Sequence, residues 1–161
     1  MTTIQKADYV FEVDVEKTIN YYKTHSLCEC VCCKNFYAQI KGMFPKLESF
    51  LSEFGIDITK PDEAMSIELD NMIQYIRVDY TVCGRIVTMG QHKINTQDDP
   101  FLSLDITDGF ASPNEQTGDY FTISVKNIFD LPWVLDKPFP KPTRPKATSK
   151  TKGFFKKIFK A

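Results

Sequence analysis

The chain has 161 residues, of which 42% are hydrophobic and 13% aromatic, values typical of one globular domain and not of a disordered chain. No run of about 18 apolar residues is present, which excludes a helix that spans a membrane. The net charge of −1 conceals an asymmetry: residues 137–161 carry nine basic residues and no acid, which leaves 11 basic and 21 acidic residues, a net charge of −10, in residues 1–136.

The first predicted elements are a strand and a helix. Residues 8–13 alternate in polarity, and Asp14 is placed to cap a helix. The apolar face of that helix repeats at helical spacing through Val15, Thr18, Ile19 and Tyr22. Residues 24–33 have no periodicity, so we predict a loop that holds four of the five cysteines.

A helical pattern returns over residues 34–55 and is interrupted by a proline. Pro45 does not fit the interior of a helix, so we expect it to open a second helix. Gly55 is placed to end that second helix in a left-handed conformation.

The pattern changes to a period of two from residue 64 onward. Segments at 65–69, 76–82, 86–89, 102–106 and 121–125 predict strands with one polar face. This order predicts an α+β fold, in which an N-terminal strand and helices pack on one face of a mainly antiparallel sheet and a flexible C-terminal tail follows. Residues 131–135, which include the single tryptophan, are expected to pack on the body, so the predicted globular domain is 1–136.

The tail divides into two parts. Residues 137–152 contain four prolines and predict an extended linker. Residues 153–161 are amphipathic, which predicts contact with a protein partner or an anionic membrane surface, or docking on the acidic body. The contact residues would be Phe154, Phe155, Ile158 and Phe159 on one side and Lys156, Lys157 and Lys160 on the other.

The cysteine cluster offers a metal-binding hypothesis. His25, Cys28, Cys30 and Cys33 supply the nitrogen and sulfur atoms that zinc prefers, although one short loop has to surround the ion. Cys83 is a distant alternative ligand. Two other interpretations stay open: a redox pair of Cys30 and Cys33 near a helix start, and cysteines that simply fill the core.

Signatures of common enzymes are missing from the sequence. It has no zinc-protease helix motif, nucleophile elbow, phosphate-binding loop or dinucleotide fingerprint. We therefore expect a non-enzymatic protein with no cofactor other than zinc. Nucleic acid is not an expected partner, because the acidic body would repel phosphate. Residues 1–12 lack the apolar segment of a secretory signal, so we expect a cytoplasmic protein with free thiols.

Three segments carry a resemblance to a family. Cys28-x-Cys30-x-x-Cys33-x-Asn35-Phe36, then residues 45–51, then Gly55-Ile56-Asp57-x-x-Lys60-Pro61 resemble a family of small uncharacterised bacterial proteins, mostly over residues 20–63. The resemblance implies that the cysteine loop is a family feature and implies no catalytic role.

Size and charge also suggest a function by analogy. Small acidic bacterial domains include toxin-neutralising immunity proteins, so our leading expectation is an intracellular protein whose acidic surface binds a protein partner. The alternatives are a zinc-stabilised domain and a peripheral membrane protein anchored by residues 153–161.

Overall fold

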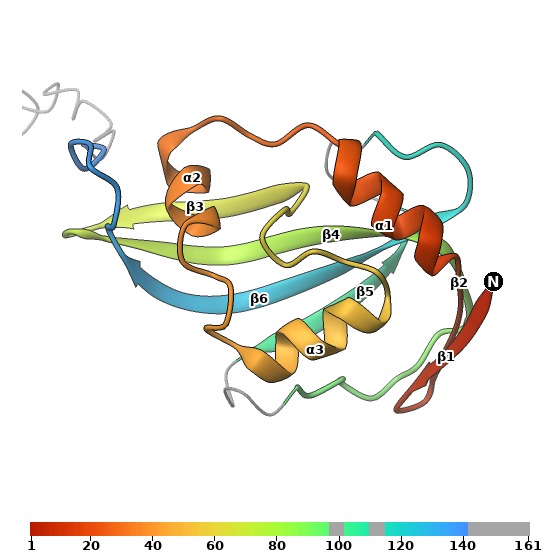
Figure 1. The fold of residues 1–161 in the computed structure, drawn as a ribbon. Helices are drawn as coiled ribbons and strands as arrows, with labels where there is room; N and C mark the ends of the chain where they lie inside the picture. The colour runs from red at the N-terminus through yellow and green to blue at the C-terminus, as the bar shows by residue number, and fades with distance from the viewer. Residues whose placement is uncertain (97–101, 110–114, 142–161) are drawn as a thin grey trace, which may run out of the picture.

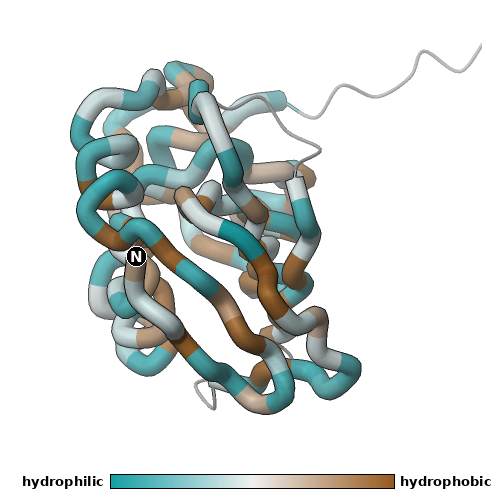
Figure 2. Tube along the Cα trace, turned by 90° about the vertical axis from the view of Figure 1, so that its right-hand side faces the viewer, coloured by the Kyte–Doolittle hydropathy of each residue, from teal (hydrophilic) through white to brown (hydrophobic). Residues whose placement is uncertain are grey.

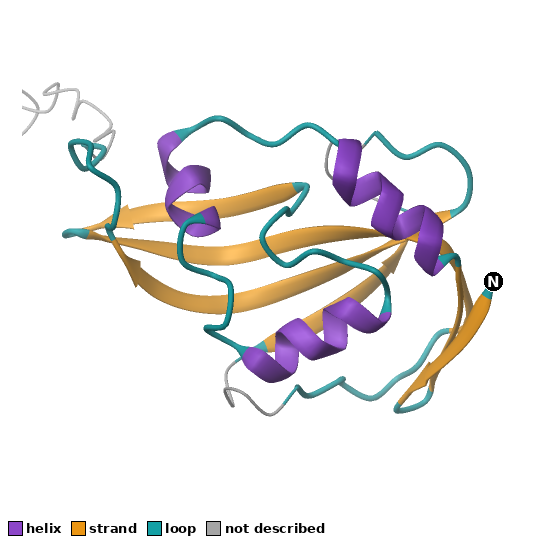
Figure 3. Ribbon diagram, in the orientation of Figure 1, coloured by secondary structure: helices purple, strands orange, loops and turns teal. Residues whose placement is uncertain are grey.

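The computed structural model describes residues 1–96, 102–109 and 115–141. In Figure 1 the helices lie over one face of the sheet, and Figure 3 shows the same arrangement by element type. This confirms the predicted α+β class. The elements in chain order are β1 (Thr2–Lys6), β2 (Tyr9–Val13), α1 (Val15–Thr24), α2 (Val31–Tyr37), α3 (Pro45–Glu53), β3 (Glu63–Leu69), β4 (Met72–Thr88), β5 (Ser103–Asp108) and β6 (Tyr120–Pro132).

The long strand β4 organises the sheet, whose strand pairs are all antiparallel. The strand order is β1-β2-β4-β6-β5, and β3 also pairs with β4. β6 pairs with one edge of β4, so the other edge is shared by β2 and β3. There β3 pairs with residues 72–79 and β2 with residues 84–88, which leaves residues 80–83 without a neighbouring strand on that edge.

Several predicted elements are confirmed. Asp14 caps α1 by accepting the Lys17 N–H at 3.0 Å, Pro45 begins α3, and Gly55 has a φ of 83° after its end. In Figure 2 hydrophilic and hydrophobic residues both occur along the strands nearest the N-terminus.

Other boundaries differ from the sequence pattern. β1 was not predicted, because only Ile4 of its five residues is buried and the pattern is correspondingly weak. α2 begins at Val31, so two cysteines placed in the predicted loop lie on a helix, and that helix already ends at Tyr37. β4 is one strand through Gly84, where a Cβ would overlap the Glu12 carbonyl oxygen, so the glycine permits β2 to approach.

The core lies between the helices and the sheet and is rich in aromatic rings. Phe11 of β2 stacks on Phe121 of β6 at 5.1 Å and meets Phe54 edge-on at 5.4 Å. Phe36 of α2 packs against Tyr75 of β4 at 5.1 Å. These contacts fasten α2 and the end of α3 to the sheet, which fixes the α2 end of the loop between α1 and α2.

Polar side chains complete the open part of the β4 edge, an arrangement that we call the α1 closure. The Thr18 hydroxyl accepts the Cys83 N–H at 3.0 Å, and the Tyr22 hydroxyl donates to the Thr81 carbonyl at 2.9 Å. The Asp62 carboxylate accepts the Thr81 N–H at 2.7 Å. Side chains thus take the place of the missing strand, as buried backbone groups require.

The last described residues remain attached to the body. The Trp133 indole donates to the Lys137 carbonyl at 2.7 Å and meets the Phe139 ring at 5.5 Å, and both rings pack on the core. This confirms that residues 131–135 pack on the body. The predictions for the remainder of the linker and for residues 153–161 fall outside the described residues, so the predicted domain boundaries stay predictions.

Candidate metal centre

Three cysteines come together where α2 begins. The sulfur atoms of Cys28, Cys30 and Cys33 all lie within 4.8 Å of one another. Cys30 is the N-cap of α2, and its sulfur accepts the Cys33 N–H at 3.3 Å. The cluster is therefore local: one helical turn brings Cys33 back to Cys30, and Cys28 precedes them by a short extended step.

The three thiols differ in environment. Cys28 and Cys30 are exposed and Cys33 is buried. Burial opposes ionisation of Cys30, but hydrogen bonds from the Cys33 amide and from the neighbouring thiols lower its pKa below the ordinary value. Burial, followed by the contacts with Cys30 and Cys28, raises the pKa of Cys33 well above it. Cys30 thus ionises more readily than Cys33.

The donor set is chemically selective. Three thiolates suit soft or borderline ions such as zinc and copper(I), and a tetrahedral ion needs a fourth ligand. The Tyr37 hydroxyl donates to the Cys28 carbonyl at 3.3 Å and holds the loop against α2. The structure therefore offers three ligands on a braced segment.

His25, the fourth predicted ligand, lies outside this group. Its ring stacks on Tyr21 at 4.8 Å and meets Tyr22 edge-on at 5.1 Å. Both ring nitrogens are buried and have no hydrogen-bond partner among the described residues. The structure thus brings three of the four predicted ligands together and places the fourth beside them with unused nitrogens.

The other two cysteines, like those of the cluster, are free thiols, but each has a separate environment. The Cys32 sulfur lies 3.7 Å from the Glu68 carboxylate of β3. Cys83 is buried on β4, where its sulfur lies 3.2 Å from the Gln116 side-chain oxygen. Cys83 is therefore not a distant ligand of the cluster, and both residues fit the interpretation that they fill the core.

A cavity of about 340 Å³ adjoins the cluster at Cys28. Three carboxylates line it, from Asp62, Glu63 and Glu115, with no lysine or arginine among the lining residues. Burial raises the pKa of Asp62, although the Tyr21 hydroxyl donates to it, and Glu115 accepts the Ser26 N–H at 3.0 Å. The sequence pattern did not reveal this cavity, because its acidic walls come from segments distant in the chain.

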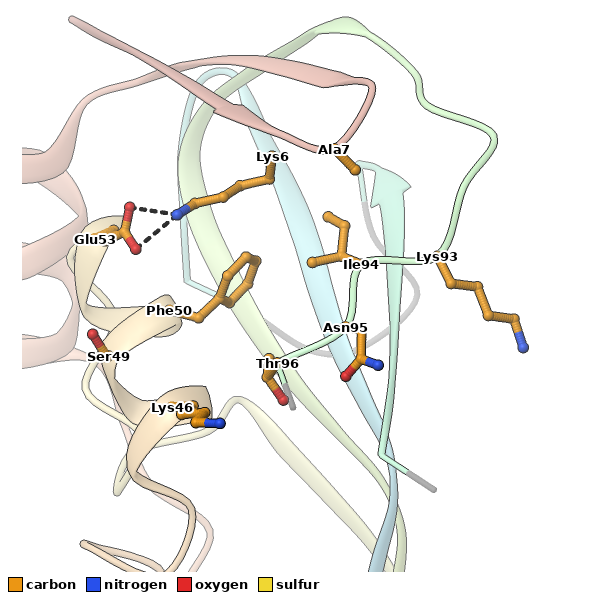
Figure 4. Close-up of a pocket in the computed structure, with 10 residues that line it drawn as sticks. All are labelled: Lys6, Ala7, Lys46, Ser49, Phe50, Glu53, Lys93, Ile94, Asn95 and Thr96. Atoms are coloured by element: carbon orange, nitrogen blue, oxygen red, sulfur yellow. Dashed lines mark hydrogen bonds and ion pairs between the residues drawn. The ribbon is translucent and has the colours of Figure 1, made fainter. Parts of the chain in front are cut away.

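A second cavity, of about 360 Å³, lies between the β1–β2 turn, α3 and residues 93–96 (Figure 4). Three lysines line it, but the Lys6 ammonium is paired with Glu53 at 2.6 Å, and Lys93 points away from the cavity in Figure 4. The cavity therefore does not gather positive charge, and we assign it no ligand.

Comparison with protein-family models, with curated proteins and with solved structures gives no match. The resemblance to a bacterial family therefore stays a prediction, as does the cytoplasmic location. None of the helices in the described ranges has the length and apolar composition needed to cross a bilayer.

Proposed function

We propose that this protein is a zinc-binding domain in which Cys28, Cys30 and Cys33 supply three thiolate ligands. The observation that carries the proposal is the convergence of the three sulfur atoms to within 4.8 Å at the start of one helix. The lowered pKa of Cys30 supports it, because zinc binds the thiolate and not the thiol.

His25 is the candidate for the fourth ligand. It precedes Cys28 by three residues, lines the same cavity as Cys28, and has two unpartnered ring nitrogens. A buried polar group without a partner costs about 1–3 kcal/mol, so coordination of one nitrogen would relieve part of that cost. Coordination by His25 would require residues 25–28 to move toward the sulfur atoms, and the resulting Cys₃His set is typical of structural zinc sites.

The role of the ion would be to stabilise the loop. Residues 26–30 are exposed and connect α1 to α2, and an ion held by Cys28 and Cys33 would link the loop to the helix. Such a link is non-enzymatic and contributes to folding directly, because the unfolded chain lacks a formed site.

Zinc content tests this proposal. Protein purified without chelator should contain one zinc ion per chain, measured by elemental analysis, and Cys28→Ser, Cys30→Ser or Cys33→Ser should reduce that amount. Cys32→Ser is the matched control, since its sulfur faces Glu68, and it should retain the metal. A zinc-free wild-type protein that keeps its full stability in chelator would exclude the site.

His25→Ala examines the fourth ligand separately. Loss of groups that merely support a ligand lowers metal affinity by about 10–100-fold, so loss of a ligand should lower zinc affinity at least as much. An unchanged affinity in a chelator-competition titration would show that His25 does not coordinate and would leave the three thiolates as the site.

We propose as a second function that the acidic body binds a basic protein partner. The cavity beside the cluster favours this, because its three carboxylates face a space of about 340 Å³ that accepts a lysine or arginine side chain. The net charge of −10 in residues 1–136 would accelerate the encounter with such a partner.

A small arginine probe tests this second function. N-acetyl-arginine amide should shift the NMR signal of the Ser26 amide, which donates to Glu115, and its uncharged citrulline analogue should not. Glu115→Gln should weaken the effect, whereas Glu16→Gln, on an exposed position of α1, should not. Equal responses to the two probes would contradict a charge-based site.

A further inference from the structure

β3 has an exposed apolar face. Met65, Ile67 and Leu69 are 49%, 44% and 40% exposed and share one side of the strand by alternation; we call these three residues the outer patch. The intervening residue Glu68 contacts Cys32 of α2, so the outer patch lies on the face of the sheet that the helices do not cover.

The position of β3 makes this exposure unusual. β3 pairs with β4 along one side only, and no strand among the described residues follows its other side. Exposed edge strands with apolar side chains attract other chains, and soluble proteins commonly cover them. The outer patch is thus a surface on which a docking segment would bury apolar area.

The C-terminal chain leaves the sheet at the same end as Leu69 of the outer patch, and the Val134 N–H then bonds Asn35 of α2 on the opposite face. Pro132, at the end of β6, pairs with Met72, and Met72 pairs with Leu69 of the outer patch. Trp133 and Phe139 then hold the chain to the body as far as the last described residues. In Figure 1 the end of the described chain lies near the β3–β4 turn.

The remaining chain is long enough to return to β3. Twelve residues lie between Lys141 and Phe154, so thirteen steps of about 3.3 Å reach about 43 Å when extended. The seven residues of β3 span about 23 Å at the same rise. A tether of this length keeps the segment at an effective concentration in the millimolar range.

Charge favours the same contact. The nine basic residues of 137–161 oppose a body with a net charge of −10.

We propose that residues 153–161 of this chain dock on the outer patch. The aromatic side of the segment covers Met65, Ile67 and Leu69, and its lysines face the acidic body. Docking hides the same apolar side chains that an anionic membrane would bind, so the body competes with any external target of the tail. Residues on the apolar side are Phe154, Phe155, Ile158 and Phe159.

Methionine methyl NMR on the full-length chain tests the contact. In protein labelled at the methionine methyl carbons, Met65 reports on the outer patch, and Met89, which is 51% exposed at the far end of β4, is the control. The double variant Phe155→Ser/Phe159→Ser should remove an upfield ring-current shift of Met65 and leave Met89 unchanged. Ile67→Ser should in turn move the amide signals of residues 154–159.

Each alternative occupant gives a different result. A Met65 signal that is the same in wild type and double variant overturns the proposal. A Met65 signal that changes on dilution but not with the tail substitutions assigns the outer patch to a second copy of the chain. This result also overturns the proposal. Tail signals that respond only to vesicles containing phosphatidylserine, with Met65 unaffected, assign the segment to a membrane and likewise overturn it.

Discussion

The α1 closure and the cysteine loop, residues 25–33, adjoin the same helix and differ in how their polar groups are paired. In the α1 closure each polar side chain has a hydrogen-bond partner, as when Thr18 bonds the Cys83 N–H and Tyr22 bonds the Thr81 carbonyl. In the cysteine loop both nitrogens of His25 are buried and have no hydrogen-bond partner in the part of the chain that the structure describes, and Cys28 and Cys30 are exposed. Tyr22 of the α1 closure and His25 of the cysteine loop are about one helical turn apart on the chain.

This difference separates stability from binding. A saturated network such as the α1 closure stabilises the native state and has no free donor or acceptor for a ligand. An unsaturated set of ligand atoms costs free energy in the absence of a ligand and gains it when the ligand binds. The cysteine loop is therefore the region whose stability should depend on solution composition.

The largest expected effect comes from zinc. With free zinc at about 1,000 times its dissociation constant, the free energy of unfolding should rise by about 4 kcal/mol above the value in chelator. Cys30→Ser should remove this increment, because it removes a ligand atom, whereas Thr18→Val should keep it. Urea denaturation with and without chelator measures both, and an increment that survives Cys30→Ser would place the metal elsewhere.

An intermediate effect is expected in the α1 closure. Thr18→Val preserves shape but leaves the buried Cys83 N–H without its acceptor, so it should lower the free energy of unfolding by about 1–3 kcal/mol. Thr24→Val is the matched control at the exposed end of α1, where a change within about 0.5 kcal/mol is expected. Equal losses in urea denaturation would show that helix propensity, and not the closed sheet edge, is the cause.

The smallest effect concerns the exposed carboxyl group of Asp8, which accepts hydrogen bonds from Gln91 and His92. Hydrogen bonds from the Gln91 amide, then from the His92 ring and amide, lower the pKa of Asp8 to about 2. Because the native state favours the carboxylate, its contribution to stability is fully present above the ordinary aspartate pKa and is lost as the pH falls toward 2. An NMR titration of the Asp8 carboxyl checks this, and a midpoint near 4 would mean that the contact is not formed in solution.

Much of the fold followed from local pattern. The cap at Asp14, the helix start at Pro45 and the alternation in β3 and β6 depend on neighbours within a few residues, and they were predictable for that reason. β1 and the start of α2 were not, because packing against distant elements overrides a weak local preference.

The cysteine cluster and the acidic cavity also differ in how far the sequence could predict them. The spacing of Cys28, Cys30 and Cys33 made a shared site a hypothesis, but the convergence of their sulfur atoms depends on a helix that begins at Val31, which the pattern did not predict. The sequence by itself thus determined the α+β class and the charged tail. Only the tertiary structure decided where His25 lies, which carboxylates share its cavity and which face of β3 stays open, because residues distant in the chain meet only when the sheet and helices pack.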